Sequence, residues 1–126
     1  MYENGKIYMG LAGDKRVELA LNMCNRHGLI AGASGTGKTV TMKVMAESFS
    51  DAGVPVFLCD VKGDVAGICA PGQSSEGMEK RIDKFGLRDR FVYQGYPTTF
   101  WDVYQEGGHA VRATVSDMGP ELLSRI

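Results

Sequence analysis

The residues from Gly32 to Thr39 read GASGTGKT, which matches the spacing G-x-x-x-x-G-K-[ST]. In this pattern small residues let successive backbone N–H groups curl around phosphate oxygens, and the following helix adds its positive dipole end. Gly32, Gly35 and Gly37 allow the backbone shape and the close approach. Lys38 is expected to reach the β and γ phosphates, and the Thr39 hydroxyl to ligate Mg²⁺. The sequence therefore predicts a Walker A loop that holds a nucleoside triphosphate with Mg²⁺.

The remaining residues of the predicted nucleotide site add backbone N–H groups or line the loop, and they are Ala33, Ser34, Thr36 and Val40. Asp60 is a second candidate, because it follows an apolar run at the position where open α/β sheets place ligand-contacting residues. There Asp60 would act beside Lys38 in catalysis by ordering the water shell of Mg²⁺. An equally weighted alternative is a polar loop that caps the strand and meets solvent. Lys62 and Asp64 are weaker candidates.

The elements around the loop have the pattern of a βαβ unit. Leu29, Ile30 and Ala31 form a short apolar run bounded by glycines, as in a buried parallel strand. From Lys38 to Ala52 the apolar residues have helical spacing, and Gly53 is the expected stop. Val54 to Cys59 is almost wholly apolar, which is typical of a strand covered on both faces. The predicted fold class is therefore α/β, a partial P-loop core built on this βαβ unit.

Weaker patterns place further elements on either side of this unit. A short β-hairpin is predicted from Lys6 to Met9 and from Val17 to Leu21, and a Gly-, Ser- and Pro-rich loop from Val65 to Gly77. A short helix containing Met78, Ile82 and Phe85 should end at Gly86. Further strands are predicted at Phe91–Tyr93, Thr99–Val103 and His109–Val115. A last helix, Glu121–Ile126, should follow a Ser116 or Asp117 cap and have Pro120 in its first turn.

Size and charge limit the alternatives. A chain of 126 residues with 44% apolar and 23% charged residues suits one globular core. A net charge of −1 gives no general attraction for nucleic acid or membranes, so any DNA contact should be local. The cysteines, Cys24, Cys59 and Cys69, form neither a disulfide pattern nor a zinc pattern. The sequence also shows no cleavable leader and no apolar run near 18 residues, so we expect a soluble cytoplasmic protein.

Other residues that could do chemistry have simpler explanations. Arg26 and His27 precede the strand predicted at residues 29–31, at its amino end and away from the phosphates. His109 and Arg112 have no paired nucleophile and are interpreted as solvated or hinge residues. Four aromatic residues could form a base-stacking surface: Tyr93, Tyr96, Phe100 and Trp101. Such a surface should have basic residues between its aromatic ones, and the sequence has none there, so packing is the better explanation.

Read together, several stretches resemble the HerA-like branch of the HerA/FtsK P-loop ATPases. They are RHGLIAGASGTGKT, GVPVFLCDVKGD, WDV and HAVRATVSDMGPELLSRI, and they cover almost the whole chain. Outside the loop, the most specific stretches are DVKGD and RATVSDMGPELL. The chain is most similar to bacterial HerA-like helicases.

The resemblance implies a RecA-like ATPase core that assembles as a homo-oligomeric ring and uses ATP hydrolysis to move on DNA. It makes ATP the expected nucleotide, and no N-K-x-D motif favours GTP. It aligns Gly32 to Thr39 with the Walker A loop, and Asp60 with the acid that ends the next strand. No apolar run followed by paired acids is present, so the chain is expected to be the N-terminal part of the ATPase domain, ending before the Walker B strand.

Without Walker B acids, a sensor or an arginine finger, the chain is expected to bind nucleotide with little turnover, since a finger alone contributes a factor of about 10³ to 10⁵. Two alternatives stay open. One is a regulatory module that binds nucleotide and does not hydrolyse it. The other is a P-loop phosphotransferase, which would need an acceptor pocket and an arginine-rich lid that the sequence does not show.

Overall fold

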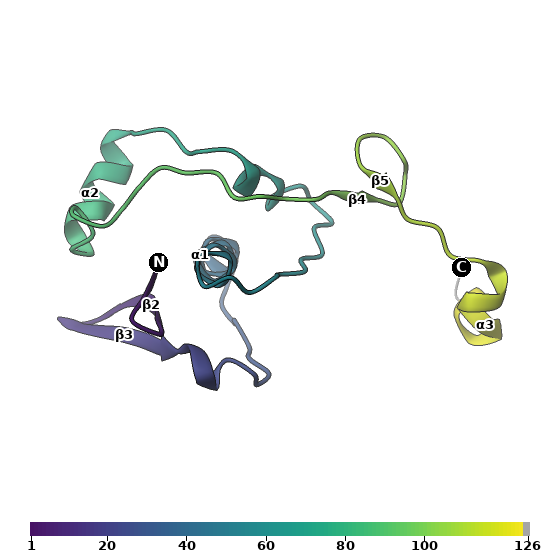
Figure 1. The fold of residues 1–126 in the computed structure, drawn as a ribbon, viewed down its shortest axis with the longest axis horizontal. Helices are drawn as coiled ribbons and strands as arrows, with labels where there is room; N and C mark the ends of the chain where they lie inside the picture. Colours follow the sequence, from purple (N-terminus) through teal and green to yellow (C-terminus); the bar gives the residue numbers. More distant parts are fainter. Residues whose placement is uncertain (125–126) are drawn as a thin grey trace. The chain divides into compact units, whose positions relative to one another are not determined.

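The structure is a computed structural model that describes residues 1–124, apart from the side chains of Val115, Leu122 and Leu123. The chain divides into two units, Met1–Tyr96 and Pro97–Ile126. The first unit contains the predicted phosphate loop and its helix. Figure 1 shows the succession of helices and strands along the chain. Each unit is described by itself below.

The first unit begins with an antiparallel sheet of three strands in the order β1-β2-β3. The strands are β1 Tyr2–Glu3, β2 Lys6–Ala12 and β3 Lys15–Ala20. The predicted hairpin is therefore confirmed, and its strands are longer than the apolar pattern indicated. Strand β1 was not predicted. Asn4 and Gly5 connect it to β2 with φ values of 49° and 75°, and the Asn-Gly pair at this turn is a strong hairpin signal in the sequence.

Helix α1, Lys38–Asp51, confirms the predicted helix after the loop. It ends as predicted at Gly53, whose φ of 76° is the left-handed conformation that glycine adopts readily. Ala46 and Ser48 are the buried residues of α1, and the helix contacts β1 and β2 (Figure 1). The buried Ser48 hydroxyl donates a hydrogen bond to the Val44 carbonyl at 2.6 Å. The sheet thus packs on the helix that presents the loop.

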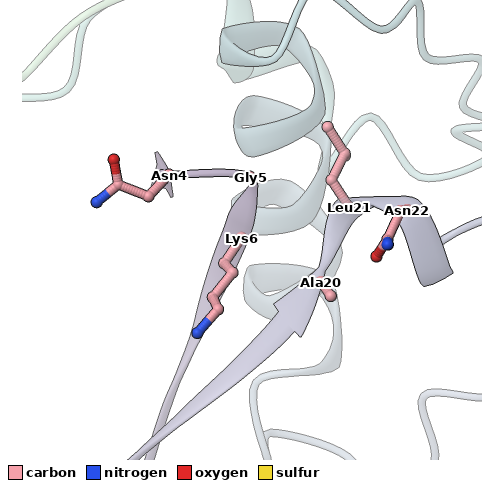
Figure 2. Close-up of a pocket in the computed structure, with 6 residues that line it drawn as sticks. All are labelled: Asn4, Gly5, Lys6, Ala20, Leu21 and Asn22. Atoms are coloured by element: carbon pink, nitrogen blue, oxygen red, sulfur yellow. The ribbon is translucent and has the colours of Figure 1, made fainter.

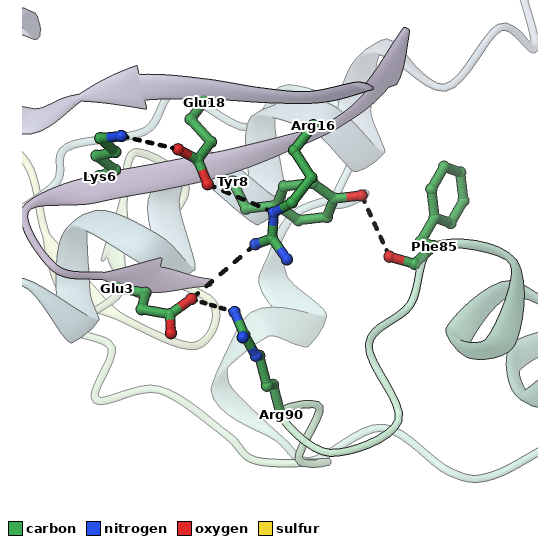
Figure 3. A network of polar contacts seen from close by, with 7 residues as sticks. All are labelled: Glu3, Lys6, Tyr8, Arg16, Glu18, Phe85 and Arg90. Carbon is green, nitrogen blue, oxygen red and sulfur yellow. Dashed lines mark hydrogen bonds and ion pairs between the residues drawn. The ribbon is translucent and has the colours of Figure 1, made fainter. Parts of the chain in front are cut away.

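Polar contacts connect the sheet with the segment that follows helix α2, Glu76–Lys84 (Figure 3). The Tyr8 hydroxyl donates a hydrogen bond to the Phe85 carbonyl at 3.3 Å. Glu3 forms an ion pair with Arg90 and a longer one, 4.0 Å, with Arg16. The Arg16 guanidinium lies 4.4 Å from the centre of the Tyr8 ring. Through these contacts the sheet is held to Phe85 and Arg90, and the Tyr8 side chain is buried.

The predicted parallel strands on either side of α1 are not formed. Residues 29–31 and 54–59 have neither strand nor helix structure, so the predicted βαβ pairing is wrong for this structure. Leu29 is 89% exposed and Phe57 is 81% exposed. A strand covered on both faces needs neighbouring strands and packed helices, and within residues 1–124 nothing covers these side chains. What the structure shows is an α/β chain with a small antiparallel sheet, and a P-loop NTPase core remains a prediction.

The middle of the chain agrees better with the local signals. The predicted loop from Val65 contains a short 3₁₀ helix, η2 Ala66–Cys69, and helix α2 spans Glu76–Lys84. The Ser75 hydroxyl accepts the Met78 N–H at 3.3 Å and caps α2. Gly86, with φ of 63°, follows the helix as predicted. The predicted strand Phe91–Tyr93 is wrong, because residues 91–100 have no strand structure.

In the second unit, the predicted strands are reduced to two residues each. Strand β4 Trp101–Asp102 pairs in parallel with β5 His109–Ala110. Gly108 makes this approach possible, because a Cβ atom there would lie 2.8 Å from the Phe100 carbonyl oxygen. The predictions for Thr99–Val103 and His109–Val115 are therefore correct in position and wrong in length.

Helix α3, Val115–Leu123, starts earlier than predicted and is interrupted at Gly119, with φ of 66° and ψ of 167°. The cap is Thr114 rather than Ser116 or Asp117. Its hydroxyl accepts the Asp117 N–H at 3.2 Å, and the Asp117 carboxylate accepts the Thr114 N–H at 3.1 Å. The last two residues of the predicted helix, 125 and 126, lie outside the described residues.

Candidate functional site

The residues of the predicted phosphate loop lie directly before α1. Gly37 occupies the N-cap position in the left-handed conformation, with φ of 95°, and makes no side-chain cap. The first intrahelical bond runs from the Thr41 N–H to the Gly37 carbonyl at 2.9 Å. The N–H groups of Lys38, Thr39 and Val40 therefore have no acceptor within the helix. The first turn also contains no acidic side chain, so the positive end of the helix dipole is not neutralised there.

The Ala33 carbonyl oxygen is the polar centre of the loop. It accepts the Thr36 hydroxyl at 2.8 Å and the Thr36 N–H at 3.4 Å. The Lys38 ammonium also donates to this oxygen, at 2.7 Å. The lysine thus folds back over the loop that precedes its own helix. In this position its charge lies beside the backbone that is predicted to surround the phosphates.

The glycines of the loop have two different physical roles. Gly35 and Gly37 have φ values of 77° and 95°, which side-chain-bearing residues rarely adopt. Gly35 is the third residue of the turn from Ala33 to Thr36, a turn position where a positive φ favours glycine. Gly32 is needed for space instead, because a Cβ atom there would lie 2.6 Å from the Thr36 Oγ1 atom. The expected backbone shape is thus seen at Gly35 and Gly37, while close approach of the backbone to phosphates stays a prediction.

The other predicted loop residues are accessible. Ser34 is exposed, Val40 is 54% exposed, and Thr39 is partly buried. The side chains of Ser34 and Thr39 form no hydrogen bond within residues 1–124. A hydroxyl without a partner, at the position that ligates Mg²⁺ in Walker A loops, fits that ion. Binding of Mg²⁺ by Thr39 remains a prediction.

Asp60 has a structural function in the loop that follows it. Its carboxylate accepts the backbone N–H groups of Asp64 at 3.1 Å, Val65 at 2.8 Å and Ala66 at 3.2 Å. These bonds, the Val65 bond most strongly, lower the pKa of Asp60 from its ordinary value. Asp60 thus holds the turn of the loop that follows it, and because residues 54–59 form no strand, the alternative of a loop that caps a strand is not observed in that form. A role in ordering Mg²⁺ water is not tested by these contacts and stays a prediction.

Asp102 repeats this arrangement in the second unit, and sequence reasoning missed it. Its carboxylate accepts the N–H groups of Tyr104 at 2.7 Å, Glu106 at 2.6 Å and Gly107 at 2.9 Å. The Gly107 bond contributes most to a lowered pKa of Asp102. An aspartate that follows a β segment and precedes a glycine-containing loop is a turn signal, and it could have identified this residue.

The remaining candidates do not join the loop. Arg26 and His27 are exposed in the irregular segment before it. The His109 ring lies 5.6 Å from the Trp101 ring, and Arg112 donates to Gln105 at 3.2 Å. Within residues 1–124, no group of three or more His, Cys, Asp or Glu side chains is placed to hold a metal ion.

Two open hollows lie elsewhere. One, of about 510 Å³, is formed by the first hairpin and the residues after β3, as Figure 2 shows. Its lining residues are Asn4, Gly5, Lys6, Ala20, Leu21 and Asn22. The other, of about 410 Å³, lies in the second unit beside Phe100 and His109. Neither includes a residue of the phosphate loop, which is an exposed surface feature in this structure.

Comparison with known families shows the class of protein, a helicase-type ATPase. The family model described as "Helicase HerA-like C-terminal" matches residues 8–126, and the chain therefore belongs to the HerA-like helicase family. No curated protein and no solved structure matches the chain. Among the described residues, no helix is both long and apolar enough to span a membrane. The resemblance found in the sequence is confirmed, while the placement of the chain as the N-terminal part of the ATPase domain stays a prediction.

Proposed function

We propose that the chain binds Mg-ATP through the loop from Gly32 to Thr39 and forms part of an ATP-driven HerA-type motor. The observation that carries this proposal is the position of the Lys38 ammonium, 2.7 Å from the Ala33 carbonyl oxygen. A flexible cation is held at the loop by a neutral carbonyl, which a phosphate oxygen can replace with a stronger, charge-assisted bond. The site thus presents its charge before any ligand arrives.

Each group of the loop has a defined part in this binding. The N–H groups of Lys38, Thr39 and Val40, which have no acceptor in α1, would donate to phosphate oxygens. The Lys38 ammonium would move from Ala33 to the β and γ phosphates. Mg²⁺ would bridge the phosphates and the Thr39 hydroxyl, where it neutralises negative charge. Ser34 and Val40 line the loop, and its glycines let the backbone approach the ligand.

We infer that this chain hydrolyses ATP slowly on its own. Three backbone N–H groups already bind the carboxylate of Asp60, the acid predicted to assist the metal, and this leaves it fewer positions for water or metal. Hydrolysis also requires groups that position water and stabilise the charge of the transition state. The sequence assigns none of them. The bonds from backbone N–H groups to Asp60 also favour a second candidate function, a module that binds nucleotide without hydrolysing it.

Calorimetric titration of the chain with Mg-ATP tests the proposal. The expected result is saturable binding that Lys38→Ala weakens by at least tenfold, because a charge-assisted contact contributes about 1.5 to 3 kcal/mol. Lys43→Ala is the matched control, since it removes the same charge from the same helix farther from the loop. Equal affinity for Mg-ATP in the two variants, or no binding by the folded wild-type chain, would overturn the proposal.

The second part of the proposal is that the protein, as a ring of identical subunits, moves on DNA. It rests on family membership. The exposed apolar segments 29–31 and 54–59 support the view that the chain contributes strands to a larger ATPase domain. The test is ATP hydrolysis by the assembled protein with and without DNA over a series of salt concentrations. We expect stimulation that decreases as salt increases. Hydrolysis unaffected by DNA at every salt concentration would refute DNA-coupled movement, whereas nucleotide binding with no hydrolysis would favour the regulatory function.

A further inference from the structure

The Ala33 carbonyl oxygen holds two side chains of the phosphate loop at once. The Thr36 hydroxyl donates to it at 2.8 Å and the Lys38 ammonium at 2.7 Å. A carbonyl oxygen has two lone pairs, so these two short bonds fill its capacity. The Thr36 N–H, at 3.4 Å, closes the same turn with a longer contact. Ala33 is therefore the acceptor on which the shape of the ligand-free loop depends.

The donors of the two short bonds, Lys38 and Thr36, would gain different amounts of energy from a new hydrogen bond to a nucleotide phosphate. Lys38 carries a full charge and gains a stronger partner when a phosphate oxygen replaces the neutral carbonyl. The Thr36 hydroxyl is neutral and has no comparable gain. When Lys38 leaves, the Thr36 bond keeps the Ala33 oxygen satisfied and the turn closed. Nucleotide arrival thus breaks one bond of the pair and leaves the other.

The space occupied by the Thr36 hydroxyl ties it to the first glycine of the loop. A Cβ atom on Gly32 would lie 2.6 Å from Thr36 Oγ1, whereas it would lie 3.5 Å from Thr36 Cβ and 3.8 Å from Lys38 Cγ. Only the hydroxyl is too close. The absence of a side chain at Gly32 is therefore what admits the Thr36 hydroxyl to the Ala33 carbonyl.

We propose that Thr36 is a positioning residue whose hydroxyl, bound to the Ala33 carbonyl over Gly32, holds the ligand-free loop in its phosphate-accepting shape. Thr36 acts through Ala33 and not on the phosphates with its side chain. This inference rests on the proposed function for its ligand, while its effect on the ligand-free loop is independent of nucleotide. Pre-ordering of this kind improves affinity by lowering the entropy lost on binding.

Two substitutions at Thr36 separate the hydroxyl from the volume of the side chain. Thr36→Val keeps the shape and removes the donor, and Thr36→Ser keeps the donor. Backbone ¹⁵N relaxation of the ligand-free chain reports the order of residues 34–37, and Mg-ATP calorimetry reports affinity. We expect Thr36→Val to lower the order parameters toward the flexible range, below about 0.6. Affinity should fall about fivefold, as for one neutral hydrogen bond, and Thr36→Ser should restore both.

Thr99→Val, the same chemical change at an exposed residue of the second unit, is the matched control and should alter neither quantity. Wild-type order parameters in Thr36→Val would overturn the inference whether or not nucleotide binds. Tighter Mg-ATP binding by Thr36→Val would also overturn it, by showing that the hydroxyl opposes the bound shape. A wild-type chain with an ordered loop and no Mg-ATP binding would refute the proposed function, and the relaxation data would still decide the role of Thr36.

Discussion

At the scale of single residues, the phosphate loop depends on a few atoms packed around one carbonyl group. Gly32 and Gly35 both lie in the phosphate loop, yet the structure requires them for different reasons. Gly35 has a φ of 77°, which an alanine would find strained, whereas a side chain at Gly32 would collide with the Thr36 hydroxyl. The effect of a substitution at Gly32 on nucleotide affinity should therefore depend on the residue at position 36, and the effect of a substitution at Gly35 should not.

A double-mutant cycle tests this difference. Gly32→Ala should weaken Mg-ATP binding by roughly 1 kcal/mol, because the Thr36 hydroxyl must leave the Ala33 carbonyl. In a Thr36→Ala background the same substitution should cost almost nothing, so the two sites should show a coupling of about 1 kcal/mol. Gly35→Ala is the control and should be additive with Thr36→Ala, since its cost comes from the backbone. Additive effects for Gly32 would contradict the observed crowding, and calorimetry provides all the affinities.

The Asp60 carboxylate offers a second test at this scale. Its bonds from backbone N–H groups lower its pKa below the ordinary value of 3.8. A lowered pKa in the folded chain means that these bonds stabilise the loop above the unfolded-state pKa and are lost as the pH falls through the folded-state pKa. The Val65 amide proton should report this loss in an NMR titration with a midpoint below 3.8. Asp60→Asn should abolish the transition, and a midpoint at or above the ordinary value would contradict the geometry.

At the scale of elements, α1 links the loop to the sheet. It begins at Lys38, within the phosphate loop, and it contacts β1 and β2. Ile7 of β2 is fully buried, with 0% exposure. The sheet therefore supports the helix whose first turn presents its N–H groups to the ligand.

Removing the side chain of Ile7 should destabilise this support. Ile7→Ala should lower the free energy of unfolding by about 2 to 4 kcal/mol, because it removes a buried side chain and leaves a cavity. Val17→Ala on β3 is the matched control. Its side chain is 43% exposed, so its cost should stay near 0.5 kcal/mol. Urea unfolding measures both, and equal losses would show that Ile7 is not part of the core.

Local signals predicted the elements well, while pairing between distant segments was not predictable from them. The apolar spacing of α1, its stop at Gly53 and the glycine after α2 depend on neighbours within one or two turns. The Asn4-Gly5 turn is equally local, and the sequence contained its signal. The strands expected at 29–31 and 54–59 depend on partners far along the chain, and a parallel pair is not stable without them. An apolar run does not specify which partner covers it.

For the site, glycines expected to shape the backbone include Gly35 and Gly37, which do have positive φ, while phosphate binding by the loop stays a prediction. The motif did not show that the Ala33 carbonyl gathers Thr36 and Lys38, since that arrangement depends on side-chain geometry. Nor did position alone decide between the two roles of Asp60. The three N–H groups that bind its carboxylate come from residues whose backbone conformation the sequence did not specify.

At the scale of the whole molecule, the chain combines family membership with apolar side chains that nothing in its described part covers. Leu29, Phe57 and Val61 are 89%, 81% and 98% exposed. Burial of such side chains against further segments or subunits would remove a large apolar area from water. With a net charge of −1, the chain also lacks a general attraction for DNA, so contact with DNA in a motor would depend on local groups. Both features fit a component of a larger ATPase assembly.

The central claim is that nucleotide binds at the loop from Gly32 to Val40, and amide chemical-shift mapping tests it most directly. Mg-ATP added to the ¹⁵N-labelled chain should shift the amides of residues 33–40 most strongly, in a saturable manner, and Lys38→Ala should reduce those shifts. The open hollow lined by Asn4 and Asn22 serves as an internal comparison, since its amides should stay unchanged. Shifts that are largest at that hollow, or absent throughout a folded sample, would contradict the claim.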